Sequence, residues 1–174
     1  MKQDPAAYRM VAAGLDENGS AVFRDEVPPA AREIPGIGSS AYFWRVAGEH
    51  SVPSSVGAPA TVPGPATDSG SALAIVRIAA GSDTRKNLSE FLDVQGHGED
   101  NDADMHATAT VDYEIILSGK IDFVLPCGQR RTLETGDLLV VTGAPHLWDN
   151  PYDEDCVYLS ITIAAPASSP HAAG

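Results

Sequence analysis

The fold is decided by residues 106–150, which read HATATVDYEIILSGKIDFVLPCGQRRTLETGDLLVVTGAPHLWDN. Polar and apolar residues alternate at the start of this segment, and in an extended chain every second side chain falls on the same face. One face carries the polar side chains of His106, Thr108, Thr110, Asp112 and Glu114, and the other carries those of Tyr113, Ile115 and Leu117. The pattern predicts a β-strand with one polar and one apolar side.

Turn signals divide the rest of the segment into short extended stretches. Gly119 interrupts the first strand, and turns are predicted at 126–129, 134–137 and 143–145. The stretches between them are 120–125, 130–133 and 138–141. Short strands with frequent turns are typical of a closed β architecture. The last turn leads into His146, and Trp148 and Asn150 share its face.

The first strand resembles the first motif of the cupin family of small β-barrels. That motif is written G-x5-H-x-H-x3,4-E-x6-G, and the chain reads His106-x-Thr108-x3-Asp112-x6-Gly119. The second family motif, G-x5-P-x-G-x2-H-x3-N, is matched from its second glycine to its Asn by residues 143–150. Here Gly136 stands one residue too close and the Pro is missing. The resemblance implies an all-β fold: a single antiparallel cupin barrel, also called a double-stranded β-helix or jelly roll, with an N-terminal strand-containing arm.

The same resemblance implies a metal centre. Metal-binding cupins commonly use two His and a carboxylate from the first motif and one His from the second. Here Thr108 replaces one His and Asp112 replaces the Glu, which leaves His106, Asp112 and His146 as ligands. Two His and one carboxylate hold non-haem Fe(II) with open positions, and Zn, Mn or Ni also suit such a set. We expect one divalent metal ion; a metal-free pocket is the alternative.

Glu114 is the residue we expect to move a proton. Its parity places it beside Asp112, whereas Tyr113 points to the other face. Two carboxylates in one cavity raise the pKa of one of them, which suits a general acid or base. Glu114 could also replace or supplement Asp112 as a ligand. We therefore predict Glu114, His106 and His146 as catalytic residues. The residues predicted to line the substrate pocket are Thr108, Thr110, Trp148 and His97.

Length, composition and charge exclude several classes of protein. The chain has 174 residues, enough for one barrel and an arm, with 43% hydrophobic and 20% charged residues. A net charge of −13 makes nucleic acid and anionic membranes poor partners. No apolar run approaches the roughly 20 residues of a membrane span, and the N-terminus lacks a signal-peptide core. We expect a cytoplasmic protein.

The remainder of the chain is predicted to form one domain with three parts. Residues 1–70 are an N-terminal arm and covering loop, 71–165 the cupin barrel, and 166–174 a flexible tail. The arm is predicted to begin with a hairpin, 8–15 and 20–27, around an Asn-Gly turn. A short aromatic strand at 42–46 is interpreted as core or interface packing. The acidic loop 95–104, which contains His97, is a solvated loop or a flap over the pocket.

Three functions are compatible with this pocket. The first is a metal-dependent, non-redox enzyme of the decarboxylase, isomerase or lyase type, in which the metal polarises a carbonyl or carboxylate of a small oxygen-rich metabolite. The second is a non-haem Fe(II) dioxygenase. The third is a non-catalytic small-molecule binding cupin, to which Thr108 points. We also expect a homodimer, with the N-terminal arm and the strand at 42–46 at the contact.

Overall fold

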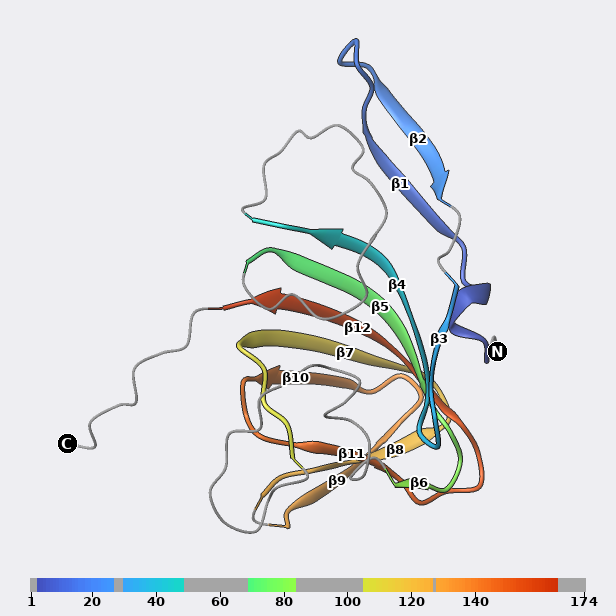
Figure 1. Cartoon of the computed structure of the whole chain (residues 1–174), viewed down its shortest axis with the longest axis vertical. Coiled ribbons are helices and arrows are strands. Elements are labelled where there is room, and N and C mark those ends of the chain that lie inside the picture. The colour runs from blue at the N-terminus through green and yellow to red at the C-terminus, as the bar shows by residue number, and fades with distance from the viewer. Residues whose placement is uncertain (1–2, 27–29, 49–68, 84–104, 127, 166–174) are drawn as a thin grey trace, which may run out of the picture.

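A computed structural model describes residues 3–26, 30–48, 69–83, 105–126 and 128–165. In these ranges the regular secondary structure is β-strand apart from one turn of 3-10 helix, η1 (Pro5–Ala7). Figure 1 shows the strands arranged as two facing layers with a separate hairpin. The predicted all-β class is therefore confirmed. The loop 95–104 with His97, most of the covering loop and the tail 166–174 lie outside the described residues.

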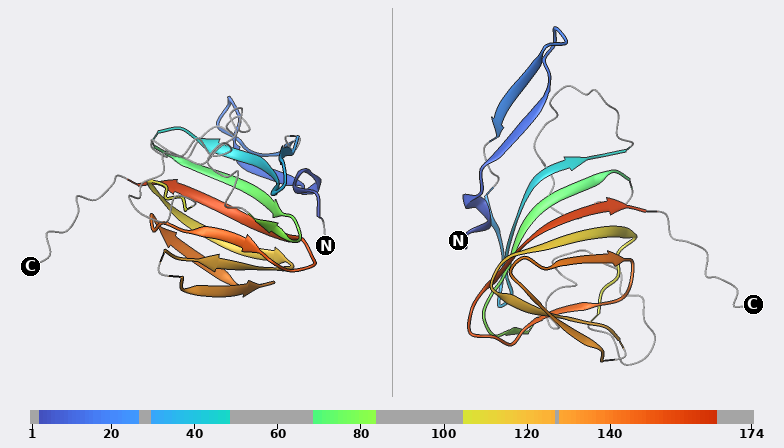
Figure 2. Two further views of the ribbon diagram at one scale, coloured as in Figure 1. Left: turned by 60° about the horizontal axis from the view of Figure 1, so that its bottom comes forward. Right: turned by 180° about the vertical axis from the view of Figure 1, so that it is seen from behind.

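Two antiparallel sheets form the barrel, and their strand order is that of a double-stranded β-helix. The larger sheet has the order β10 (Leu138–Thr142), β7 (Thr110–Ser118), β12 (Cys156–Ala164), β5 (Ser71–Ile78), β4 (Gly38–Val46), β3 (Arg32–Ile34). The smaller has the order β6 (Ser82–Asp83), β11 (Leu147–Asn150), β8 (Lys120–Val124), β9 (Arg130–Glu134). The sheets converge on one side and open on the other, and Figure 2 shows this from two further directions. The cupin fold is thereby confirmed.

The space between the sheets holds the main hydrophobic core. Ile78, Ile116, Ile121, Trp148 and Tyr158 are among the buried side chains of this cluster. They come from both sheets, and each occupies alternate positions of its strand, because a strand presents every second side chain to one face. Burial of these side chains supplies the main free energy that holds the two sheets together.

A second apolar cluster lies on the outer face of the larger sheet. Phe43, Ile75 and Val157 are buried there, and Tyr8 and Met10 of the N-terminal segment pack against them. The N-terminal segment thus covers part of the sheet. The predicted strand at 42–46 is the end of β4, and Phe43 is only 3% exposed. Phe43 therefore packs within the chain and is not available to a second copy.

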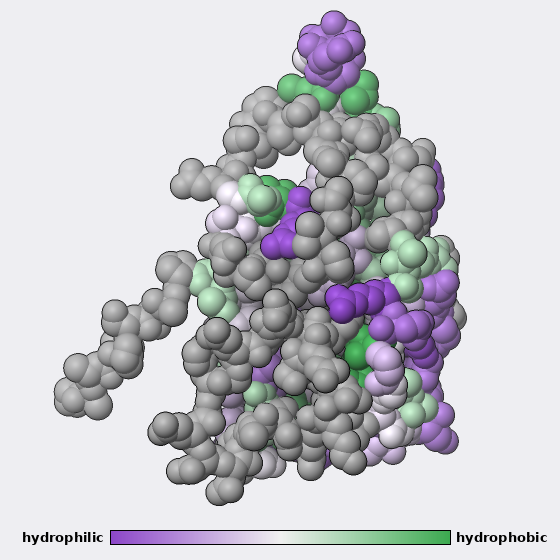
Figure 3. Space-filling view, in the orientation of Figure 1, coloured by the Kyte–Doolittle hydropathy of each residue, from purple (hydrophilic) through white to green (hydrophobic). Residues whose placement is uncertain are grey.

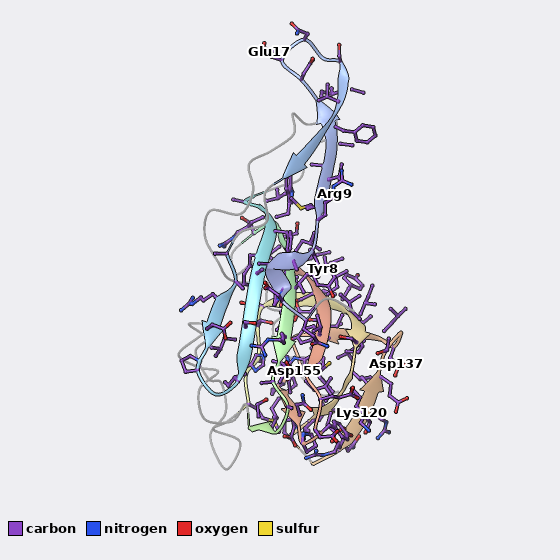
Figure 4. All side chains as sticks on the ribbon, turned by 90° about the vertical axis from the view of Figure 1, so that its right-hand side faces the viewer. Tyr8, Arg9, Glu17, Lys120, Asp137 and Asp155 are labelled. Atoms are coloured by element: carbon purple, nitrogen blue, oxygen red, sulfur yellow. The ribbon has the colours of Figure 1, made fainter. Side chains whose placement is uncertain are left out.

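The predicted N-terminal hairpin is confirmed. It consists of β1 (Met10–Leu15) and β2 (Ala21–Glu26), which pair in antiparallel register. Asp16 stabilises the turn, because its Oδ1 accepts hydrogen bonds from the backbone N–H groups of Asn18 and Ser20. The hairpin projects away from the two sheets, with Glu17 at its tip (Figure 4). The tip is hydrophilic in Figure 3.

The predicted start of the barrel at residue 71 needs correction. β4 pairs with β5 along most of its length, and β3 pairs with β4, so both strands belong to the larger sheet. The sheet therefore begins at Arg32, well before residue 71. Sequence patterning missed this because the barrel motifs lie downstream, and β4 is separated from β5 by a long Pro- and Ser-rich connection.

Candidate active site

The inner face of β7 carries the predicted polar side chains. Thr110, Asp112 and Glu114 are 2%, 7% and 6% exposed, whereas Tyr113 between them is 44% exposed on the outer face. Alternation along the strand therefore sends both carboxyl groups into the protein, as the sequence predicts. Two adjacent inward-facing acids on one strand are costly to bury and need either a cation, a proton or a ligand.

The two carboxyl groups have few hydrogen-bond donors. Glu114 Oε1 accepts a hydrogen bond from Ser160 at 3.1 Å, and Asp112 Oδ2 accepts one from Thr108 at 3.5 Å. Glu114 Oε2 and Asp112 Oδ1 are buried without a partner among the described residues. Burial raises the pKa of both groups, and the nearby Asp112 raises the pKa of Glu114 further. The pair therefore retains protons at a higher pH than ordinary carboxyl groups do.

His106 and His146 lie side by side, although they come from opposite ends of the segment 106–150. Their backbones exchange two hydrogen bonds of 3.0 Å in an isolated antiparallel bridge. Their ring centroids are 4.2 Å apart, with the rings tilted by 58°. His146 also stacks on Phe123 at 4.7 Å. The bridge thus joins the two motifs through their histidines.

Both imidazoles are held in the neutral form. Burial, and then the neighbouring His146, lowers the pKa of His106 to about 3. Burial also lowers the pKa of His146. The Nδ1 atom of His146 lies 2.8 Å from the Ala144 carbonyl oxygen, which can only accept, so Nδ1 carries the proton. Its Nε2 lone pair is then available to a ligand, and His106 Nδ1 is buried without a hydrogen-bond partner among the described residues.

The structure brings together two of the three predicted metal ligands. The two histidines are adjacent, but within the described ranges no three His, Cys, Asp or Glu side chains are grouped as a metal ion requires. Asp112 instead accepts hydrogen bonds from Thr108 and Thr110. The donor chemistry of the pair fits a divalent ion, since both rings are neutral. Asp112, the predicted carboxylate ligand, is not grouped with the two histidines.

The predicted pocket residues have different surroundings. The hydroxyl groups of Thr108 and Thr110 contact one another beside Asp112, which places both in the polar cluster. Trp148 is 5% exposed, stacks on Tyr158 at 4.9 Å and meets Phe123 edge-on at 5.0 Å. Trp148 therefore packs in the core. His97 lies outside the described residues.

Tyr42 and Ser160, which the sequence patterns did not single out, belong to the polar cluster around Asp112 and Glu114. Tyr42 lies opposite Ala74, Ala74 lies opposite Ser160, and Ser160 lies opposite Glu114, so all four share the inner face. Burial, and then the charge of Glu114, raises the pKa of Tyr42 to about 12. Strand pairing alone sets this row, and no local pattern predicts it. Ser160 could have been found by parity, because its neighbours Leu159 and Ile161 are apolar.

Comparison with known proteins gives partial relatives and a fold. No protein-family model matches the chain. Phomopsin biosynthesis cluster protein C' of Diaporthe leptostromiformis is 41% identical over 64 residues, which are 37% of this chain and 32% of that protein. The chain thus matches about a third of that relative's length. Within the described residues no helix is long and apolar enough to span a membrane.

Two solved structures are similar to part of the chain. One is an uncharacterised double-stranded β-helix protein of Klebsiella pneumoniae, 14% identical, with a TM-score of 0.48 over 79% of this chain and 85% of that one. Another is the DMSP lyase DddQ of Ruegeria pomeroyi, 21% identical, with a TM-score of 0.40 over 60% of this chain and 43% of that one.

Proposed function

We propose that this chain, which has the cupin fold, is an enzyme that moves protons on a small oxygen-rich metabolite without redox change. The reaction would be an elimination, a decarboxylation or an isomerisation. One observation carries the proposal: Asp112 and Glu114 lie side by side on the inner face of β7, buried, each with an oxygen that has no partner among the described residues. No described cation pairs with either of them. An arrangement that destabilises a fold this way is typical of functional acids.

Glu114 suits the role of proton carrier. Its raised pKa keeps a proton available toward neutral pH, where an ordinary glutamate has lost it. Ser160 holds Oε1 through a hydrogen bond, so that Oε2 is the oxygen able to give or take the proton. Asp112, restrained by Thr108 and Thr110, contributes to the raised pKa of Glu114.

We further propose that His106 and His146 hold a divalent metal ion, with Fe, Zn, Mn and Ni as candidates. Support comes from the adjacent neutral rings and from the tautomer that Ala144 imposes on His146. When bound, such an ion would polarise a carbonyl or carboxylate of the substrate. The protein's own contribution is to position the two rings through the backbone bridge and to supply the proton from Glu114.

The substrate class has one line of support outside the site. The chain shares 64 residues at 41% identity with a protein of the Phomopsin biosynthesis cluster. We propose that this chain likewise acts on an intermediate of a biosynthetic route. The non-catalytic binding alternative is supported by Thr108, which stands where metal-binding cupins have a histidine. A cytoplasmic location remains a prediction from the sequence.

The proposal can be tested by proton exchange. Protein purified without chelator is incubated in D2O with small β-hydroxy and β-keto acids, and NMR follows deuterium entry at the acidic carbon, elimination and loss of CO2. Glu114→Gln should lower the rate by roughly 10²–10⁴-fold, the usual contribution of a general acid or base. Tyr113→Phe, a neighbour on the outer face, is the control. Wild-type rates in Glu114→Gln would exclude Glu114 as the proton carrier, and binding without any turnover would favour a binding protein.

A further inference from the structure

Two rows of paired residues cross the inner face of the larger sheet. One row runs from Glu114 through Ser160 and Ala74 to Tyr42. The other runs from Asp112 through Thr162 and Ala72 to Arg45. Three strand spacings, roughly 14 Å, separate the two ends of each row at the level of the backbone. The sheet thus sets two acids opposite a phenol and a guanidinium.

The residues between these ends are small. Ala72, Ala74, Ser160 and Thr162 are all buried, at 2–9% exposure, and none has a long side chain. Long side chains therefore stand at the two ends of each row and short ones between them. A small molecule lying across the sheet would meet polar groups at both ends, and these can fix its orientation.

A β-bulge directs Arg45 to this face. The register between β4 and β5 shifts between Tyr42 and Trp44, so that Trp44 lies opposite Leu73 on the outer face and Arg45 lies opposite Ala72 on the inner face. In a regular strand, Tyr42 and Arg45 would point to opposite faces. The extra residue places the side chains of Tyr42 and Arg45 on the same inner face. Bulges of this kind re-aim side chains beside active sites.

The charge of Arg45 is not neutralised by the described residues. Arg77 and Arg130, by contrast, are both ion-paired, to Asp155 and Asp122 respectively. Arg45 is half-buried, and no ion pair or hydrogen bond joins its side chain to another described residue. An arginine keeps its charge at every physiological pH, so a half-buried one favours a bound anion. Its fork of donors matches a carboxylate.

We propose that Arg45 and Tyr42 form a carboxylate-binding subsite, so that the substrate is a small organic acid whose carboxylate lies at β4 and whose reacting carbon lies toward Glu114. This inference rests on the proposed function, because it assigns the orientation of the substrate in that site. Arg45 attracts an anion to the β4 end, whereas no described cation pairs with the acids at the β7 end, and this difference fixes the direction. Arg32 lies opposite Ser40 on the same face and adds positive potential at Tyr42.

The test compares acids with their uncharged isosteres on chelator-treated protein. Acetate, lactate and benzoate are each measured against acetamide, lactamide and benzamide by titration calorimetry or ligand-observed NMR. At least one acid should bind about tenfold more tightly than its amide, the scale of one well-placed charged hydrogen bond. Arg45→Ala should remove this preference and Arg45→Lys should restore part of it. Tyr42→Phe should weaken the acid and leave the amide unchanged.

Arg131→Ala provides the matched control, since it removes an exposed arginine from β9. Equal binding of acid and amide, no binding of any acid, or an unchanged preference in Arg45→Ala would overturn the subsite. A preference that exists only after metal is added would also overturn it, because the metal would then be the anion receptor. Glu114→Gln should keep the preference for acids. Absence of turnover with a retained preference for acids would therefore contradict the proposed reaction and leave the subsite intact. Turnover without a preference for acids would contradict the subsite alone.

Discussion

The rings of His106 and His146 lie 4.2 Å apart, and the same two residues exchange backbone hydrogen bonds in both directions. Backbone bonds hold the pair together, so the side chains can be removed without breaking the bridge. The backbone bridge therefore connects the two motifs, and the imidazole side chains are not needed to maintain it. The imidazoles are thus available to bind a ligand.

Metal content should depend on both histidines. His106→Ala and His146→Ala should each strip a divalent ion from protein purified without chelator, as measured by elemental analysis. Each variant should remain folded, as judged by circular dichroism. Its free energy of unfolding should fall by about 1–3 kcal/mol, because one buried side chain is removed. Tyr113→Phe should keep the metal content of the wild type. Unchanged metal in both histidine variants would rule out this pair as a metal centre.

Two of the motif glycines, Gly119 and Gly136, should differ in their tolerance of a side chain. Gly119 has a φ of 72°, and a Cβ there would collide with the backbone carbonyl of Asp155. Gly119→Ala should cost about 3 kcal/mol or more in the free energy of unfolding, because both strain and overlap must be relieved. Gly136 has a φ of 97° with open space around it, so Gly136→Ala should cost about 1–2 kcal/mol from strain alone.

Chemical denaturation of both variants checks this difference. The two substitutions add the same methyl group at a positive φ, and only their surroundings differ. Equal losses of stability would mean that the contact between Gly119 and Asp155 relaxes freely.

The stability of the smaller sheet should fall in acid because of Asp122, which is 4% exposed. Burial alone would raise the pKa of Asp122, but hydrogen bonds from Arg130, Thr132 and Tyr152 outweigh it and lower the pKa below 3.8. The ionised carboxylate therefore stabilises the fold above pH 3.8, and this contribution is lost as the pH falls through the lower folded-state value. The Arg130 side chain is 41% exposed, so solvent reduces the part due to its ion pair.

Asp122→Asn tests this pH dependence. The variant should be about 1–3 kcal/mol less stable than wild type at pH 7, because Arg130, Thr132 and Tyr152 lose a charged acceptor. The difference should shrink as the pH falls below 3.8, because the unfolded carboxylate then takes up its proton while the folded one, whose pKa is lowered, stays ionised to lower pH. Denaturation curves between pH 3 and 7 measure it, with the exposed Asp153→Asn as the control. A difference that stays constant across this range would contradict the assignment.

The protein should be a homodimer with the N-terminal hairpin at the contact. Phe23 is 81% exposed and Val11 44%, and pairing of Phe23 with Ala13 puts these side chains on one face of the hairpin. Such an apolar face suits a second copy. Light scattering should give about twice 18.2 kDa at micromolar concentration. Phe23→Asp should yield a monomer, whereas Leu138→Asp, at an exposed site on β10, should leave the dimer intact.

A monomer in the wild type would contradict the prediction of a dimer. A monomer caused by Leu138→Asp, with Phe23→Asp still dimeric, would move the contact from the hairpin to the outer face of β10.

The sequence by itself determined the polar face of β7. Alternation at period two assigned Asp112 and Glu114 to the inside and Tyr113 to the outside, and the exposed fractions agree. Turn residues predicted the N-terminal hairpin, because its turn chemistry is local. The two motifs in order also indicated the barrel. Each of these inferences needed only residues close together in the chain.

Tertiary structure decided which side chains meet. His106 and His146 became neighbours through strand pairing between distant residues, and Asp112 was drawn instead toward Thr108 and Thr110. Arg45 reached the same inner face as Tyr42 through a one-residue bulge between them, which reverses the parity of every residue beyond it. Parity is a local property of a strand, but a bulge and a register are set by the partner strand, so the sequence alone could not assign these two residues to the site.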